Sequence, residues 1–181
     1  MRSFVEEVAA TPGGGDIWAC IQCGVCTGSC PAAGEMEHPP RKIIAMTRAG
    51  MRDEVLSSSS MWHCLSCYMC TVRCPRNIKP TELAHALESL ATQQGFNVRE
   101  TRTPAFYRSF ISSIKDNGRI HEFGMMAWFY LKTNLLAAMM LLPLALSLLL
   151  HGRMPLKPHR VKGREELKQI LRKFAEVGYA Q

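Results

Sequence analysis

Two stretches decide the fold of this chain: Cys20-Ile-Gln-Cys-Gly-Val-Cys-Thr-Gly-Ser-Cys-Pro31 and Cys64-Leu-Ser-Cys-Tyr-Met-Cys-Thr-Val-Arg-Cys-Pro75. Both follow the pattern C-x2-C-x2-C-x3-C-P, and the second begins 44 residues after the first. Together they contain all eight cysteines of the 181-residue chain. The chain therefore carries an internal repeat, and no cysteine is left for any other role.

The repeated spacing predicts two iron–sulfur clusters. Thiolates bind [4Fe–4S] clusters, and in bacterial ferredoxins a run of this kind places its fourth cysteine on the other cluster. We therefore expect two [4Fe–4S] clusters with crossed ligands and no catalytic residue in this chain. The expected ligands are Cys20, Cys23, Cys26 and Cys74 for cluster one, and Cys64, Cys67, Cys70 and Cys30 for cluster two.

Two other uses of cysteine fit the pattern less well. Structural zinc also uses C-x2-C pairs, but it requires neither the third cysteine of each run nor the proline after the fourth. A disulfide framework is typical of small secreted domains, whereas residues 1–7 contain no apolar stretch like that of a secretory signal. Free thiols and cluster assembly need reducing conditions, so we expect a cytoplasmic protein. Association with the cytoplasmic face of a membrane stays open.

The basic excess of the chain lies near its C-terminal end. The net charge is +7, and residues 151–181 contribute eight Lys and Arg against three Asp and Glu. A basic tail can bind nucleic acid, but no aromatic interleaving supports that here, so we expect no nucleic-acid partner. We divide the chain into a two-cluster ferredoxin-like domain, residues 1–96, and a helical extension, residues 97–181.

The sequence around the motifs predicts a mainly α fold. Apolar residues recur at helical spacing near the N-terminus, over residues 41–56 and after Pro80, and no strand pattern longer than a few residues is present. We expect a bacterial-type α-helical ferredoxin domain with two [4Fe–4S] clusters, followed by a C-terminal helical extension. We also expect Trp62 and Tyr68 to shield cluster two from water.

The extension combines amphipathic and apolar segments. Amphipathic helices are predicted over residues 97–122, ending near Asn117-Gly118, and in the basic tail over residues 164–177. The apolar segment 123–150 lies between them. Its uncharged part, Leu135 to Leu150, would be about 24 Å long as a helix, which is shorter than the roughly 30 Å of a hydrocarbon core. Three interpretations stay open: burial against a partner subunit, membrane-surface contact through residues 123–162, and a span, which length and Pro143 disfavour.

The motifs and the sequence beyond them resemble the small iron–sulfur C subunit of heterodisulfide reductase and its homologues in sulfur-oxidising bacteria. Many ferredoxin-like subunits share the cysteine pattern. The C-terminal stretches are therefore what distinguishes this family from the others. The resemblance covers most of the chain from about Asp16 onward. The stretches that carry it are Cys20–Pro31, Cys67-Tyr-Met-Cys-Thr-Val-Arg-Cys-Pro-Arg-Asn-Ile-Lys-Pro80, Glu122-Phe-Gly-Met-Met-Ala127 and Leu150-His-Gly-Arg-Met-Pro-Leu-Lys-Pro158.

The resemblance implies an electron-transfer subunit. In such complexes the small iron–sulfur protein passes electrons between a flavin-containing A-type subunit and a cysteine-rich B-type subunit that holds the disulfide-active clusters. The Cys-Cys-Gly motifs of the B-type subunit are absent from this sequence, so conversion of a disulfide or sulfane sulfur would occur in the partner. The apolar segment 123–150 favours the sulfur-oxidising, membrane-associated version.

Two other functions stay open at this point. One is an iron–sulfur subunit of a quinone-linked respiratory dehydrogenase, as in succinate or glycolate oxidation. The other is a stand-alone ferredoxin, although a diffusing carrier would not be expected to expose so apolar a C-terminal half.

Overall fold

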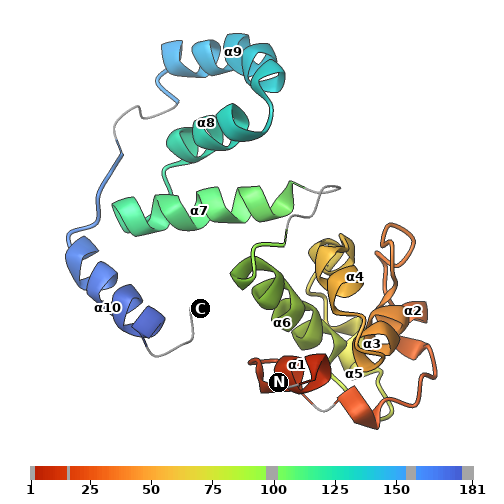
Figure 1. The fold of residues 1–181 in the computed structure, drawn as a ribbon. Helices are drawn as coiled ribbons and strands as arrows, with labels where there is room; N and C mark the ends of the chain where they lie inside the picture. Colours follow the sequence, from red (N-terminus) through yellow and green to blue (C-terminus); the bar gives the residue numbers. More distant parts are fainter. Residues whose placement is uncertain (1–2, 16, 97–101, 154–157, 177–181) are drawn as a thin grey trace. The chain divides into compact units, whose positions relative to one another are not determined.

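The computed structural model describes residues 3–15, 17–96, 102–153 and 158–176, and these residues form helices and loops without a strand (Figure 1). The mainly α prediction is therefore confirmed. The chain divides into two compact units, residues 1–101 and 102–181. The domain boundary expected after residue 96 adjoins residues 97–101, which lie outside the described residues.

Unit one is built from short helices around one hydrophobic core. The fully buried members of this core include Val8, Ile44, Val55 and Leu87. Three of the expected cluster ligands pack against it as partly buried side chains, so the core supports the cysteine motifs directly. In chain order the elements are α1 (Phe4–Ala10), the 3-10 turn η1 (Ile17–Ala19), α2 (Val25–Gly28), α3 (Pro40–Arg48), α4 (Arg52–Ser57), the 3-10 turn η2 (Ser60–His63), α5 (Met69–Val72) and α6 (Pro80–Gln93).

The single helix expected over residues 41–56 is wrong, because the structure has two helices there. Gly50, between α3 and α4, has a φ of +77°, a conformation that costs L-residues with a side chain free energy. The Gly50 amide donates to the Thr47 carbonyl, and the Met51 amide donates to the Met46 carbonyl. This hydrogen-bond pattern is that of a glycine-terminated helix end, so α3 stops and the chain changes direction before α4.

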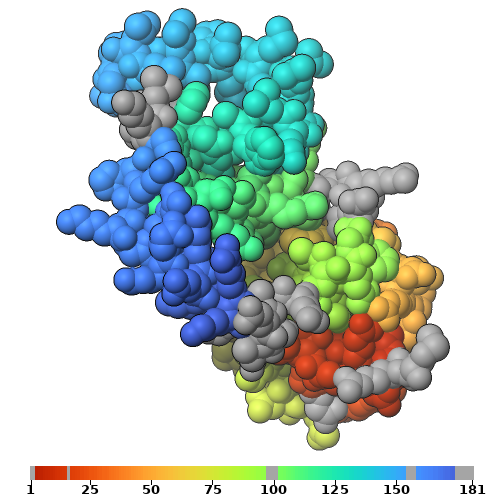
Figure 2. All heavy atoms as spheres, turned by 60° about the vertical axis from the view of Figure 1, so that its left-hand side comes forward, coloured from red at the N-terminus to blue at the C-terminus, as the bar shows by residue number. Residues whose placement is uncertain are grey.

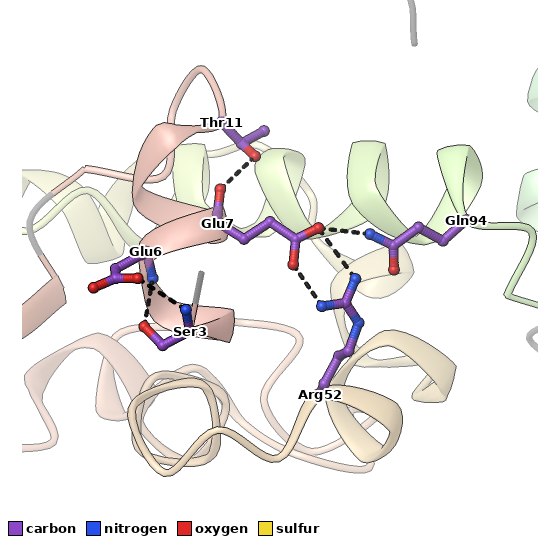
Figure 3. Close-up of polar contacts among 6 residues, drawn as sticks. All are labelled: Ser3, Glu6, Glu7, Thr11, Arg52 and Gln94. Atoms are coloured by element: carbon purple, nitrogen blue, oxygen red, sulfur yellow. Dashed lines mark hydrogen bonds and ion pairs between the residues drawn. The ribbon is translucent and has the colours of Figure 1, made fainter. Parts of the chain in front are cut away.

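An ion pair connects the helices of unit one at its edge (Figure 3). The Glu7 carboxylate on α1 accepts hydrogen bonds from Arg52 Nη1 and Nη2, at 2.5 and 3.1 Å. It also accepts one from Gln94 Nε2, just after α6, at 2.8 Å. Ser3 and Glu6 form a capping box at the start of α1. These contacts hold α1 against α4 and α6.

Unit two contains α7 (Thr103–Asn117), α8 (Glu122–Thr133), α9 (Leu135–Leu150) and α10 (Arg164–Glu176). The end of α7 agrees with the prediction, because Gly118 follows it with a φ of +77°. The Phe106 and Phe129 rings pack edge to face between α7 and α8, 5.7 Å apart. Val177, where we expected the last helix to end, lies outside the described residues.

The apolar segment 123–150 forms two helices rather than one. Asn134 separates them with extended backbone, and its side-chain oxygen accepts from the Ala137 amide at 3.1 Å, capping α9. In Figure 2 the side chains of α9, in light blue, lie at the surface of the molecule. Within the described residues, no helix is long and apolar enough to cross a membrane. The exposed apolar side chains of α9 include Leu135, Leu136, Met139, Met140, Leu142, Leu144, Leu146 and Leu150.

Candidate iron–sulfur sites

The two cysteine motifs adopt the same backbone conformation. Gln22 and Gly24 have φ values of 58° and 84°, and the residues 44 positions later, Ser66 and Tyr68, have φ values of 51° and 60°. Both motifs then form a four-residue helix, α2 or α5. The hydrogen bonds that close these turns also recur at the same offset. The repeat in the sequence is therefore a repeat in the structure.

This conformation is maintained even where it is strained. A left-handed φ costs an L-residue about 1–2 kcal/mol, and of the four positions with positive φ only position 24 is a glycine. Strained backbone of this kind persists where the surrounding structure determines it, often at functional sites. The surrounding structure therefore imposes the same turn on both motifs, including at the three positions without a glycine.

The cysteines line two hollows in unit one, and each hollow combines both motifs. Helices α2 and α5 pack against each other, which brings the last cysteine of each motif beside the other motif. Ile44 and Pro80 line both hollows, so the two share a wall. We name each hollow after the cysteine that comes from the other motif. The Cys74 hollow is lined by Cys20, Cys23, Cys26 and Cys74, and the Cys30 hollow by Cys64, Cys67, Cys70 and Cys30.

The residues at both hollows fit a [4Fe–4S] cluster. Such a cluster is bound by four cysteine thiolates, and each hollow presents four free thiols. In both motifs the second cysteine, Cys23 or Cys67, is exposed, whereas Cys70 is buried. Among the described residues, no group of three or more His, Cys, Asp or Glu is placed to hold a single metal ion.

Burial affects the protonation of two of the thiols. It raises the pKa of Cys26 and of Cys64 above the ordinary value, and for Cys64 the nearby Glu88 carboxylate adds to the rise. Burial likewise raises the pKa of Glu88, to about 7. Cluster ligands are thiolates, so the positive charge of bound iron would have to offset this preference for the neutral thiol.

Two arginines line the Cys74 hollow and a third lies beside it, and sequence reasoning missed all three. Arg41 and Arg76 line the hollow, and Arg76 Nε donates to the Ala19 carbonyl at 3.2 Å. Arg48 Nη1 donates to the Cys20 carbonyl at 2.7 Å. The three come from separate segments of the chain, so no spacing rule connects them. Arg41 and Arg76 each directly follow a proline, and this is the only local feature of the sequence that could have pointed to them.

The expected shielding of cluster two by Trp62 and Tyr68 is not supported, because neither residue lines the Cys30 hollow. Tyr68 holds the left-handed turn of its motif, and 47% of the residue is exposed. Trp62 is half-buried and packs against the hydrophobic core. The hollow is instead closed by smaller apolar side chains, among them Ile43, Met61 and Leu83.

Comparisons with known proteins agree with this geometry. Residues 16–78, which contain both motifs, match the family described as a 4Fe-4S dicluster domain. The chain is 38% identical over 113 residues to the C2 subunit of the H(2)/formate:CoB-CoM heterodisulfide,ferredoxin reductase of Methanococcus maripaludis, with 59% of this chain and 61% of that protein covered. It is 37% identical over 107 residues to the second iron-sulfur C subunit of the CoB–CoM heterodisulfide reductase of Methanocaldococcus jannaschii, with 59% and 57% covered.

A third relative gives the same result over a shorter stretch. The C subunit of the H(2):CoB-CoM heterodisulfide,ferredoxin reductase of Methanothermobacter thermautotrophicus is 37% identical over 95 residues, with 52% of this chain and 51% of that protein covered. The chain thus spans about half to three fifths of the length of these relatives. Residues 16–78 match a 4Fe–4S dicluster domain, and their eight cysteines fit two [4Fe–4S] clusters. The relatives named above are C subunits of heterodisulfide reductases, and one of them is named as an iron–sulfur subunit.

Proposed function

We propose that this chain relays electrons through two [4Fe–4S] clusters within a heterodisulfide-reductase-like complex. The relay connects a flavin-containing A-type subunit with a cysteine-rich B-type subunit, where conversion of a disulfide or sulfane sulfur takes place. The observation that carries this proposal is the pair of four-thiol hollows that share Ile44 and Pro80 as a wall. Two redox groups so close together form a path rather than two independent centres.

The proposed ligands follow the hollows. Cys20, Cys23, Cys26 and Cys74 hold cluster one, and Cys64, Cys67, Cys70 and Cys30 hold cluster two. When bound, such clusters exchange single electrons with neighbouring redox groups. The protein fixes their positions and excludes water from the shared wall. The side chains at that wall are apolar, so they neither accept protons nor carry charge of their own.

Assembly with other subunits is supported by the relatives, whose names describe them as subunits of larger reductases. Unit two offers the surface for such assembly or for peripheral membrane contact. The exposed fractions are 74% for Leu136 and 83% for Met140, which lie one turn apart on α9. Large exposed apolar patches mark interaction sites in soluble proteins, so we expect α9 to be covered in the working assembly.

Isolation of the chain with its companions tests this function. The complex is purified under anaerobic conditions from its native source through an affinity tag on this chain, and the companions are identified by mass spectrometry. The expected companions are a flavoprotein and a protein with Cys-Cys-Gly motifs. Quinone-reactive membrane subunits in their place would contradict the proposal and favour a respiratory dehydrogenase.

The same purification, carried out with variants of α9, tests the docking role of this helix. A variant with both Leu136→Glu and Met140→Glu should keep its clusters but lose its companions, since two charges would then face an apolar partner surface. Lys115→Glu on α7, at an exposed position, is the control and should leave the assembly intact. Unchanged recovery of companions with the double variant would show that α9 is not the docking surface.

A further inference from the structure

The two hollows differ in the charge of their lining. Two arginines, Arg41 and Arg76, line the Cys74 hollow. Among the described residues that line the Cys30 hollow there is no Arg, Lys, Asp or Glu, and His38 is the one basic side chain. Arg73 lies within the second motif but lines neither hollow. The guanidinium groups are therefore concentrated at one hollow.

The other contributions to the cluster surroundings nearly match. The backbone repeats at an offset of 44 residues, turn for turn, so amide groups are arranged alike around both hollows. Side-chain hydrogen bonds to a sulfur occur at both hollows. Gln22 Nε2 lies 3.4 Å from Cys20 Sγ, and Thr81 Oγ1 lies 3.3 Å from Cys70 Sγ. The arginines are thus the main difference between two similar sites.

Charge near a cluster changes its reduction potential. Reduction adds one negative charge to the cluster, and a nearby positive charge stabilises the added electron. Arg48 contributes as well, because it donates to the Cys20 carbonyl and so lies beside the Cys74 hollow.

We propose that Arg41, Arg48 and Arg76 give cluster one, at the Cys74 hollow, a higher reduction potential than cluster two. This proposal rests on the proposed two-cluster relay and adds an order to it. In this order one electron would pass from cluster two to cluster one, so that cluster two becomes oxidised and cluster one becomes reduced. No bond would form and no proton would move. Electrons delivered by a reduced flavin therefore collect at cluster one, the point from which a disulfide-active partner would draw them.

The test is a redox titration of the whole, cluster-loaded chain, followed by electron paramagnetic resonance. Arg41→Gln and Arg76→Gln each remove one charge from an exposed arginine that lines the Cys74 hollow. Each variant should lower the higher of the two midpoint potentials and leave the lower one in place. Arg41→Lys should restore the potential, since the charge is kept. The shift should shrink at high salt, because exposed charges are screened.

Two matched variants separate a local effect from net charge. Lys115→Gln removes one charge from unit two and should move neither potential. Leu65→Lys adds a charge at the lining of the Cys30 hollow, at a residue that is 66% exposed, and should raise the lower potential. If Arg76→Gln fails to bind iron because its bond to Ala19 is lost, Arg41→Gln decides the question.

Some outcomes would overturn the proposal. A shift of the lower potential in Arg41→Gln, or equal potentials that do not respond to either substitution, would contradict the proposed order. Such a result would leave the two-cluster relay intact, because both clusters would still be reduced. Failure of the relay itself would appear differently, as a chain without two reducible clusters or without redox partners.

Discussion

Cys74, the last cysteine of the second motif, lines the same hollow as Cys20, the first cysteine of the first motif. Cys30 and Cys64 have the reciprocal relationship at the other hollow. In both motifs a short helix, α2 or α5, lies between the second and the fourth cysteine. The fourth cysteine therefore leaves the loop on the side of the neighbouring motif. Two small loops can in this way build two four-thiol sites that neither could build alone.

Each hollow has its own four thiols, so the intact chain should hold two complete clusters. We predict about eight iron and about eight sulfide per anaerobically purified chain, as two cubanes require. Iron and zinc are measured together by mass spectrometry, and sulfide is measured by a colorimetric assay. A content near two zinc ions per chain would contradict the iron–sulfur assignment.

The contact between Glu7 and Arg52 should stabilise unit one. Arg52→Gln removes a bidentate ion pair. Its side chains are only partly exposed, 38% for Arg52 and 29% for Glu7. We expect the free energy of unfolding to fall by about 1 kcal/mol, the upper range for pairs that are not fully buried. Urea unfolding followed by circular dichroism measures the change. Lys79→Gln, which breaks the more exposed pair with Glu82, is the control and should have a smaller effect.

Gly118 and Gly152 form a matched pair for unit two. Both have a positive φ, 77° and 66°, so alanine at either position costs about 1–2 kcal/mol of backbone strain. An added Cβ at Gly118 would also lie 3.1 Å from Val161 Cβ, whereas one at Gly152 would have no atom of the described residues within 4 Å. Gly118→Ala should therefore lower the thermal midpoint more than Gly152→Ala. Equal midpoints would show that the contact with Val161 does not constrain this turn.

Glu88 should make stability depend on pH. Burial raises its pKa from 4.5 to about 7, so between these values the folded chain binds more protons than the unfolded chain. Stability from this residue is therefore lost as pH rises through that window. Glu88→Gln should match the unmodified chain near pH 5 and exceed it in unfolding free energy near pH 8. Glu54→Gln, at an exposed carboxylate on α4, should show no such difference between the two conditions.

The sequence predicted the parts of the fold that follow from local rules. The cysteine spacing identified both motifs. The crossed assignment of each fourth cysteine stays a prediction, which the lining of the two hollows supports. The end of α7 followed from Asn117-Gly118. The break at Gly50 was missed because apolar residues on both sides of it continued at helical spacing, although one glycine was enough to end α3.

Tertiary properties could not be predicted in the same way. Arg41 and Arg76 line one hollow, and Arg48 contacts the Cys20 carbonyl beside it, because segments distant in the sequence pack together. Nothing in the spacing of the three arginines indicates this. The exposure of α9 is a similar case. An uncharged helix is equally suited to the core of its own chain and to an external surface, and its composition does not distinguish the two.

The crossed arrangement is tested most directly by the iron content of paired cysteine variants. If Cys20 and Cys74 bind the same cluster, the Cys20→Ala/Cys74→Ala variant should lose one cluster and keep about four iron per chain. The variant Cys20→Ala/Cys30→Ala, with both changes in the first motif, should lose both clusters. The reverse pattern, with iron retained in the second variant and absent from the first, would show that each motif binds its own cluster and would contradict the account.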